Sequence, residues 1–270
     1  SIFYPQRTTI ESFDEFRYFT GVTEILSHTF RGCQALTSIT LPNTLIDVNS
    51  AAFRDCSSLL SVTLPNMVES IGSNIFYDCS NLESLYIPAS VKSTGSNMFR
   101  GCNKLHIVVD ANNQNFSSLD GSFFNKSQTT LIEYTKADVQ PEYTVPNGVT
   151  TLGDYAFYYR SNMTSITLPS TLSKIGGNTF AYCTKLSTLR FDGANAPTTT
   201  GDSFGSAASS YTGQATHNTG ENKIYLSQFN AKGFDEGLFL DPLQNASKCG
   251  FSIHGKLIIN SNRSNARFSV

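Results

Sequence analysis

The chain has 270 residues, and its 19 Lys and Arg residues nearly balance 21 Asp and Glu residues. The charged fraction of 15% lies well below the roughly 25% of typical soluble proteins. No block of basic residues occurs, so the positive stripe that nucleic-acid binding needs is missing and we expect no nucleic-acid partner. No run approaches the roughly 18 apolar residues of a membrane-spanning helix, and we expect no transmembrane segment.

Residues 1–20 lack the charged start, apolar centre and small-residue cleavage site of a signal peptide. Because the chain opens at Ser1 and not at Met, we interpret it as a fragment or a mature form. The missing signal therefore says little about location, and a lipid anchor upstream of Ser1 is compatible with the sequence.

A phenylalanine recurs every 23 residues along most of the chain. It stands at Phe30, Phe53, Phe76, Phe99, Phe157 and Phe180. The third position after it holds Cys33, Cys56, Cys79, Cys102, Arg160 and Cys183. The sixth, ninth and eleventh positions are apolar in every copy, Val108 being a ninth position, with Asp110 as the one exception at an eleventh position. A fixed period of this length predicts a solenoid in which stacked coils share one core.

Each coil is predicted to carry one short strand, as in Leu-x-x-Ile-x-Leu at residues 36–41. Alternation of apolar and polar residues is typical of a strand with one buried face. A proline follows at Pro42, Pro65, Pro88 and Pro169 and ends the strand, because it has no N–H to continue a ladder. The rest of each coil is long enough for a helical turn but not for a helix.

The regular spacing is interrupted once, where two successive phenylalanines lie 58 residues apart, which is two periods plus 12. Tyr134, one period before the later phenylalanine, is the expected first position of a coil. About 12 residues near 122–133 are therefore predicted to be inserted. With Asp120-Gly121 before it and Asn125-Lys126-Ser127 within it, the insertion is predicted to be a hairpin that bulges from one edge.

The motif Phe-x-x-Cys-x-x-Leu-x-x-Ile/Val-x-Leu-Pro resembles the BspA-like class of leucine-rich repeats over residues 20–204. It differs from the better-known class, in which an asparagine ladder follows the strand. The resemblance implies a leucine-rich-repeat solenoid, a right-handed coil with a curved parallel β-sheet on its concave side. Short turns or 3-10 segments are expected on the convex side, with little regular helix outside an N-terminal cap.

The flanks are similar to this family as it occurs in Bacteroidetes surface proteins. Residues 12–20 resemble its N-terminal cap, expected to be one helix, and residues 222–226, 241–243 and 248–251 resemble its C-terminal region. We predict a cap at 1–29, a solenoid of about seven 23-residue coils at 30–204, a last partial coil and C-terminal cap at 205–254, and a tail of unknown role at 255–270. The Ser/Gly/Thr-rich stretch 205–222 is predicted to be a long loop.

Five of the six cysteines share one repeat position and are predicted to form a ladder inside the solenoid. Buried, free thiols are favoured. Disulfides between neighbouring rungs and a metal site are the alternatives, weakened by the parallel side chains and by ligands that do not converge on one point. The four histidines share no repeat position, and no catalytic motif occurs. We predict no metal, no cofactor, no catalytic residue and no enzymatic activity.

The outward side chains of the predicted strands are mostly serine and threonine, whose simplest role is to solvate the concave face. Tyr86 and Arg190 are the large exceptions, and both are residue types that dominate binding hot spots. Together with Thr63 and Thr167 they are the predicted ligand-binding residues.

A second ladder follows the phenylalanines by one residue and includes Arg54 and Arg100. These arginines can meet Asp55 or Asp78 from adjacent coils and form a solvated lattice of ion pairs. An acidic or glycan partner for this ladder is the alternative.

The family resemblance implies export, often with a lipid anchor at the cell surface, and a role in adhesion or ligand binding. We therefore predict an exported or secreted, monomeric and non-enzymatic interaction module that recognises a host protein or a glycan. The alternative is a structural spacer or stalk that presents another domain.

Overall fold

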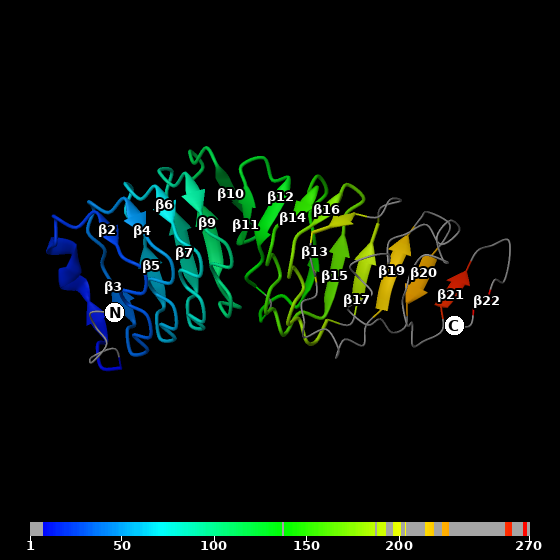
Figure 1. Ribbon diagram of the computed structural model, residues 1–270, viewed down its shortest axis with the longest axis horizontal. Coiled ribbons are helices and arrows are strands. Elements are labelled where there is room, and N and C mark those ends of the chain that lie inside the picture. The colour runs from blue at the N-terminus through cyan, green and yellow to red at the C-terminus, as the bar shows by residue number, and fades with distance from the viewer. Residues whose placement is uncertain are drawn as a thin grey trace. The chain divides into compact units, whose positions relative to one another are not determined.

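Figure 1 shows the protein as a computed structural model. It describes residues 8–136, 138–186, 188–192, 197–200 and 203, and the backbone of four later strands. The chain divides into two compact units, the first Ser1–Gln128 with Glu133–Val139, the second Thr129–Ile132 with Gln140–Val270. One of these strands, Gln214–Asn218, lies within 205–222, so the prediction of a loop was wrong for these residues. The rest of this stretch, and the predicted C-terminal cap and tail apart from the other strands, lie outside the described residues, and the predicted domain bounds stay predictions.

The first parallel ladder of unit 1 takes one strand from each coil and is divided into two sheets. In one sheet, strand β1 (Ser12–Phe13) pairs with β3 (Ser38–Ile39). In the other, β5 (Ser61–Thr63), β7 (Ser84–Ile87) and β9 (His106–Val109) lie in this order. Side chains alternate between exposed and buried along β5, β7 and β9, as predicted from the sequence. Strand β7 ends directly before Pro88, which has no N–H to extend the ladder.

A second parallel ladder of unit 1 lies in the other half of each coil. It consists of β2 (Glu24–Ile25), β4 (Asp47–Val48), β6 (Ser70–Ile71) and β8 (Ser93–Thr94). Turns follow these strands up to each phenylalanine, and their N–H groups donate to carbonyls one coil on, as from Phe30 to Ala52 at 2.8 Å. The predicted turns are therefore joined by a second row of short strands, which satisfies backbone groups between coils.

Unit 2 repeats both ladders. One consists of β12 (Thr130–Glu133), β14 (Thr151–Leu152), β16 (Lys174–Ile175) and β18 (Thr198–Thr199). The other consists of parallel β13 (Glu142–Thr144), β15 (Ser165–Leu168), β17 (Thr188–Phe191) and β19 (Gln214–Asn218). It continues with antiparallel β20 (Lys223–Leu226), β21 (Leu257–Asn260) and β22 (Arg267–Phe268). The predicted solenoid with parallel sheets and almost no helix is confirmed.

The repeated phenylalanines form a stack inside unit 1. The rings of Phe30 and Phe53 lie 5.2 Å apart, those of Phe53 and Phe76 5.6 Å, and those of Phe76 and Phe99 6.2 Å, all nearly parallel. In unit 2 the ring of Phe180 stacks on that of the phenylalanine one coil before it. Each ring is almost fully buried, so the 23-residue period is the spacing of one core rung.

The cysteine ladder lies in the core beside this stack. Cys33, Cys56, Cys79, Cys102 and Cys183 are free and fully buried. The thiol of Cys56 donates to the carbonyl of Phe30 at 3.1 Å, and three further rungs repeat this bond one coil at a time. The predicted buried thiols are confirmed. In unit 2 the fully buried Arg160 takes one rung of the ladder.

The N-terminal cap differs from the single helix expected over residues 12–20. It is strand β1 followed by a 3-10 helix, η1 (Asp14–Tyr18). The reason is the spacing of Phe13, Phe16 and Phe19, because a 3-10 helix has three residues per turn and places such side chains on one side. The rings of Phe13 and Phe16 lie 6.3 and 5.6 Å from that of Phe30 and cover the end of the stack.

The hairpin lies earlier than the expected insertion near 122–133. Strands β10 (Phe116–Leu119) and β11 (Ser122–Asn125) pair antiparallel. Asp120-Gly121 is the turn itself and not a flank, since both residues have positive φ, 49° and 77°, as a two-residue hairpin turn requires. Residues 130–133 belong to strand β12, and the ring of Phe123 meets that of Phe99 edge-on at 6.5 Å, which closes the stack.

Glu133 replaces a missing coil-to-coil bond beside this hairpin. In regular coils the phenylalanine N–H donates to a backbone carbonyl of the next coil, as from Phe76 to Met98. The N–H groups of Met98 and Phe99 instead donate to the two carboxylate oxygens of Glu133, each at 3.0 Å. Glu133 is buried, so its side chain satisfies donors that the hairpin would otherwise leave without partners.

The register of β9 corrects the assignment of Val108 and Asp110 to buried positions. Leu85 pairs with Ile107 and Tyr86 pairs with Val108, an offset of 22 residues. Ile107 and Val109 are therefore the buried residues, and Val108 is 43% exposed. One residue is missing between the sixth-position leucine and the strand, and a one-residue shift turns every side chain to the other face. The apolar pattern is thus unbroken in this coil.

Candidate functional site

The outward face of the sheet formed by β5, β7 and β9 is called the strand face here. Thr63, Tyr86 and Val108 are in register across β5, β7 and β9, and Ser61, Ser84 and His106 form the row beside them. All six are exposed, with Tyr86 at 38%. An aromatic ring and an isopropyl group thus lie side by side on a face that elsewhere carries small polar groups.

A carboxylate holds Tyr86 in place on the strand face. The Tyr86 hydroxyl donates a hydrogen bond to Asp110, which also accepts from the Asn112 N–H at 2.8 Å. The Tyr86 bond is the main reason that the pKa of Asp110 is lowered, and the same bond raises the pKa of Tyr86. Ring, hydroxyl and carboxylate therefore form one fixed polar and aromatic unit open to solvent.

The other two predicted residues lie on the corresponding face of unit 2. Thr144, Thr167 and Arg190 are in register across β13, β15 and β17. The Arg190 Nε lies 2.7 Å from the Asp192 carboxylate, and both side chains are part-exposed. Exposed ion pairs contribute little, so a ligand carboxylate can compete for this guanidinium. The four predicted residues are thus two neighbouring pairs, Thr63 with Tyr86 and Thr167 with Arg190.

His106 and Val108 belong to the strand face but escaped the sequence analysis. The fixed period placed Val108 in the core, and His106 shares no repeat position with another histidine. The signal that could have found them is the alternation in His-Ile-Val-Val, because a strand with Ile107 and Val109 inside must have the other two outside.

The ladder beside the phenylalanines in unit 1 combines ion pairs with ring stacking. The ion pair between adjacent coils is that of Arg31 with Asp55, at 3.4 Å. Arg54, predicted to meet an aspartate of an adjacent coil, lies 3.5 Å from the Asp55 carboxylate of its own coil. The guanidinium carbons of Arg54 and Arg100 lie 4.1 and 4.3 Å from the centre of the Tyr77 ring. Tyr77 is almost buried, so the two arginines sandwich it and the lattice is aromatic as well as ionic.

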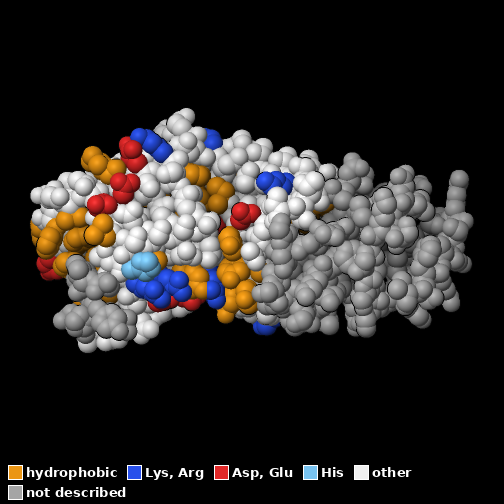
Figure 2. Space-filling view, viewed as in Figure 1, with side chains coloured by type: hydrophobic (Ala, Val, Ile, Leu, Met, Phe, Trp, Pro, Cys, Tyr) orange, Lys and Arg blue, Asp and Glu red, His pale blue; other side chains and the backbone are white. Residues whose placement is uncertain are grey.

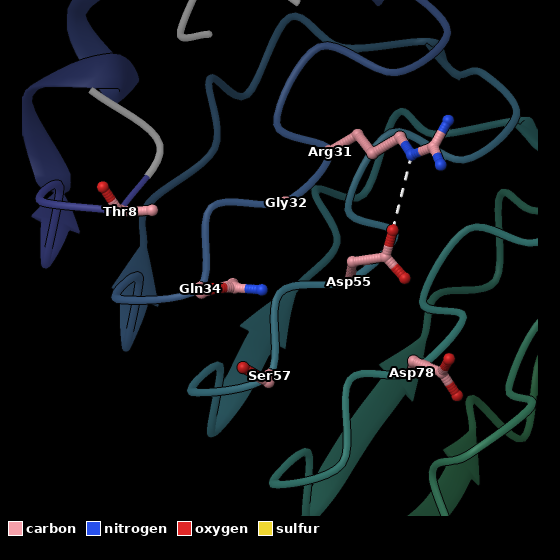
Figure 3. A pocket seen from close by; sticks show the side chains of 7 residues that line it. All are labelled: Thr8, Arg31, Gly32, Gln34, Asp55, Ser57 and Asp78. Atoms are coloured by element: carbon pink, nitrogen blue, oxygen red, sulfur yellow. Dashed lines mark hydrogen bonds and ion pairs between the residues drawn. The ribbon is translucent and has the colours of Figure 1, made fainter. Parts of the chain in front are cut away.

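A pocket of about 390 Å³ opens beside this ladder (Figure 3). It is lined by Thr8, Arg31, Gly32, Gln34, Asp55, Ser57 and Asp78. Burial and the neighbouring Asp55 charge raise the pKa of Asp78, against the opposing effect of Arg54. Two of the polar lining residues, Arg31 and Asp55, form the ion pair drawn in Figure 3.

Four tyrosines gather at the turns of unit 2. The ring of Tyr158 lies 5.2 Å from that of Tyr155 and 5.5 Å from that of Tyr182, which lies 5.4 Å from that of Tyr159. All four are half-buried. We call Tyr155, Tyr158, Tyr159 and Tyr182 the tyrosine cluster. The cluster was not predicted as a site, because its tyrosines occupy different positions of the repeat and come together only when the coils stack.

The described residues hold no group of three or more His, Cys, Asp or Glu side chains placed to bind a metal ion. Within the same residues, no helix has the length and apolar character needed to cross a bilayer. Figure 2 shows a face that is mostly neither hydrophobic nor charged, with the charged side chains in small groups.

These features define a leucine-rich-repeat solenoid, the class of protein in which each coil adds one strand and one core rung. A model of the BspA type leucine rich repeat region matches residues 8–131 and 135–231 in six copies. The chain belongs to this family. No curated protein matches the chain.

Two solved structures of bacterial proteins share the fold. The pneumococcal vaccine antigen PcpA is 26% identical, with a TM-score of 0.50, over 68% of this chain and 50% of that one. A leucine-rich repeat protein from Eubacterium ventriosum is 23% identical, with a TM-score of 0.53, over 72% of this chain and 64% of that one. A leucine-rich cell surface protein from Faecalibacterium prausnitzii is 22% identical with a TM-score of 0.46, over 68% of this chain and 60% of that one. The chain therefore spans less than two thirds of each.

Proposed function

We propose that this chain is an exported, non-enzymatic interaction module that recognises a host protein or a glycan at the cell surface. The strand face of unit 1 and the corresponding face of unit 2 are the proposed recognition surfaces. The observation that carries the proposal is the Tyr86–Asp110 unit with the exposed Val108 beside it. Tyrosine combines a large apolar ring with a polar tip, and such residues carry much of the energy of binding surfaces.

The comparisons support export and a surface role without naming a ligand. The family consists of repeats that build binding scaffolds, and the PcpA structure is that of a vaccine antigen. Rigid strands support these side chains, and rigid support lowers the entropic cost of binding. Export, surface display, a monomeric state and any lipid anchor remain part of the proposal.

The test is a binding screen of the purified chain against arrays of extracellular-matrix proteins and glycans. A chain with both Tyr86→Ala and Arg190→Ala should bind the ligand found in this screen about tenfold or more weakly, the loss expected for a hot-spot side chain. Its melting temperature should stay within a few degrees of the unmodified chain, because both side chains are exposed.

The control is Tyr18→Ala, which removes a tyrosine that is 69% exposed in the N-terminal cap. It should leave binding unchanged. If the double variant binds as well as the unmodified chain, the strand faces are not the recognition surfaces. If neither array gives a signal above a denatured sample, the interaction module is refuted and the alternative, a spacer or stalk that presents another domain, takes its place.

A further inference from the structure

The tyrosine cluster departs from the repeat at positions where the backbone does not favour tyrosine. Tyr155, Tyr159 and Tyr182 have φ of 64°, 60° and 62°, in the left-handed region that bulky residues rarely adopt. Most other coils fill the equivalent positions with the residues that tolerate this region. Asn74, Asn97 and Asn178 correspond to Tyr155, and Asp55, Asp78 and Gly101 correspond to Tyr159 and Tyr182.

Neither the turn nor the core explains these side chains. Asparagine, aspartate and glycine form the same turns in other coils, and the core behind them is already filled by Phe157 and Phe180, which are fully buried. The tyrosine rings are half-buried against one another on the surface. The positive φ belongs to the turn of each coil, so the departure from the repeat is the choice of tyrosine at three such positions.

Two ring pairs of the cluster meet edge to face, and each of the four side chains is partly exposed. Tyr158 meets Tyr155 at 90° and Tyr182 at 88° between ring planes, so the rings do not stack into one closed layer. Ring faces accept the C–H groups of a sugar ring, and tyrosine hydroxyls accept and donate hydrogen bonds to sugar hydroxyls.

Charge and size favour a neutral ligand of modest length. Arg160, which directly follows Tyr159, is fully buried and offers no charge at the surface. The two exposed charged side chains within three residues of the cluster have opposite signs and are engaged, since Asp154 accepts from the Gly177 N–H at 2.8 Å and Lys185 donates to Asn162 at 2.7 Å. A stable protein interface needs roughly 800 Å² on each partner, which is several times the area of four half-buried rings. A neutral oligosaccharide covers such a surface with a few sugar units.

From these observations we infer that the tyrosine cluster is a binding site for a neutral oligosaccharide. The inference goes beyond the proposed function, because it assigns a second surface and the chemical class of its ligand. It uses none of the strand-face residues, so either proposal can fail alone.

The experiment titrates the purified chain with linear trisaccharides of glucose, galactose, mannose and N-acetylglucosamine. Binding is followed by saturation-transfer NMR and by tyrosine difference absorbance, which tryptophan does not obscure because the chain has none. At least one trisaccharide should bind the unmodified chain. The double variant Tyr159→Asn with Tyr182→Asn should bind it about tenfold or more weakly, with an equal or higher melting temperature because asparagine suits the backbone there.

Two controls separate the outcomes. Tyr159→Phe keeps the ring and should retain most of the binding, and Asp78→Asn alters the equivalent position of unit 1 and should change nothing. The inference is overturned if no trisaccharide binds the unmodified chain, or if the double asparagine variant binds the trisaccharide as well as the unmodified chain does. It is also overturned if the double asparagine variant no longer binds a protein ligand but still binds the trisaccharide. If only the Tyr86→Ala, Arg190→Ala variant loses trisaccharide binding, the inference is also overturned, and the strand face is then supported as the recognition surface.

Discussion

The hydroxyl of Tyr86 donates a hydrogen bond to the carboxylate of Asp110, which lies one coil further along the chain. One residue is missing before β9, so Asp110 directly follows this strand, as Pro88 directly follows β7. The hydrogen bond fixes the largest side chain of the strand face and joins a negative charge to it.

This bond predicts a specific pH dependence of stability. The Tyr86 hydroxyl and the Asn112 N–H lower the pKa of Asp110 below its ordinary value of 3.8. The stabilising effect of the ionised carboxylate is therefore complete above the pKa of the unfolded chain and is lost as the pH falls through the lower folded value. Asp110→Asn should remove this part of the pH dependence. The measurement is urea unfolding of both chains at several pH values from neutral down into the acid range, over which the difference between their free energies of unfolding should shrink. A difference that is the same at all these pH values would refute the link.

Glu133 should be among the most sensitive buried positions of unit 1. Glu133→Ala leaves the buried N–H groups of Met98 and Phe99 without their acceptors, at a cost of roughly 1–3 kcal/mol for each. Glu133→Gln keeps one good acceptor and should cost less. Chemical unfolding gives both values, and Glu83→Ala, an exposed glutamate of the same unit, should change the free energy by less than about 0.5 kcal/mol. Equal effects of Glu133→Ala and Glu83→Ala would show that the carboxylate does not hold the coil.

Gly72 marks a close approach between coils. A Cβ atom at this position would lie 2.3 Å from the backbone nitrogen of Ser50, so Gly72→Ala must push two coils apart and should cost more than about 2 kcal/mol. Gly21→Ala is the matched control, because a Cβ atom there would meet no other part of the described chain within 4 Å. Thermal unfolding should show a clear loss for Gly72→Ala and almost none for Gly21→Ala. Similar melting temperatures for the two would contradict the packing.

The cysteine rungs should resist thiol reagents in the folded protein. All five are fully buried, and burial, with a smaller contribution from Cys56, raises the pKa of Cys79 well above its ordinary value. Only the thiolate reacts. Iodoacetamide labelling followed by peptide mass spectrometry should leave Cys33, Cys56, Cys79, Cys102 and Cys183 unmodified until denaturant is added. Labelling of these peptides at neutral pH without denaturant would mean that the ladder opens.

The repeat made most of the scaffold predictable. A residue that recurs at the same place in several coils reveals its burial through spacing alone, and this holds for the phenylalanine stack, the cysteine rungs and the prolines that end strands. Because neighbouring coils share one core, a position that is buried in one coil is expected to be buried in the next coil too.

The departures from the repeat were not predictable in the same way. Loss of one residue before β9 moved Val108 to the surface, and a fixed period cannot register such a deletion when both alternatives are apolar. Glu133 acts on Phe99, 34 residues away, through a contact that only the folded hairpin creates. The tyrosine cluster likewise forms between coils, so neither its rings nor its backbone conformation is visible in one coil.

The central claim is that recognition resides in the exposed side chains that depart from the repeat. The most direct measurement is the affinity of three proteins for the ligands found in the array screens: the unmodified chain, the Tyr86→Ala with Arg190→Ala variant, and the Tyr159→Asn with Tyr182→Asn variant. We expect each ligand to bind one of the two variants more weakly than the unmodified chain and to bind the other variant with unchanged affinity, while all three proteins unfold at similar temperatures. Equal affinities of all three for every ligand would contradict the claim.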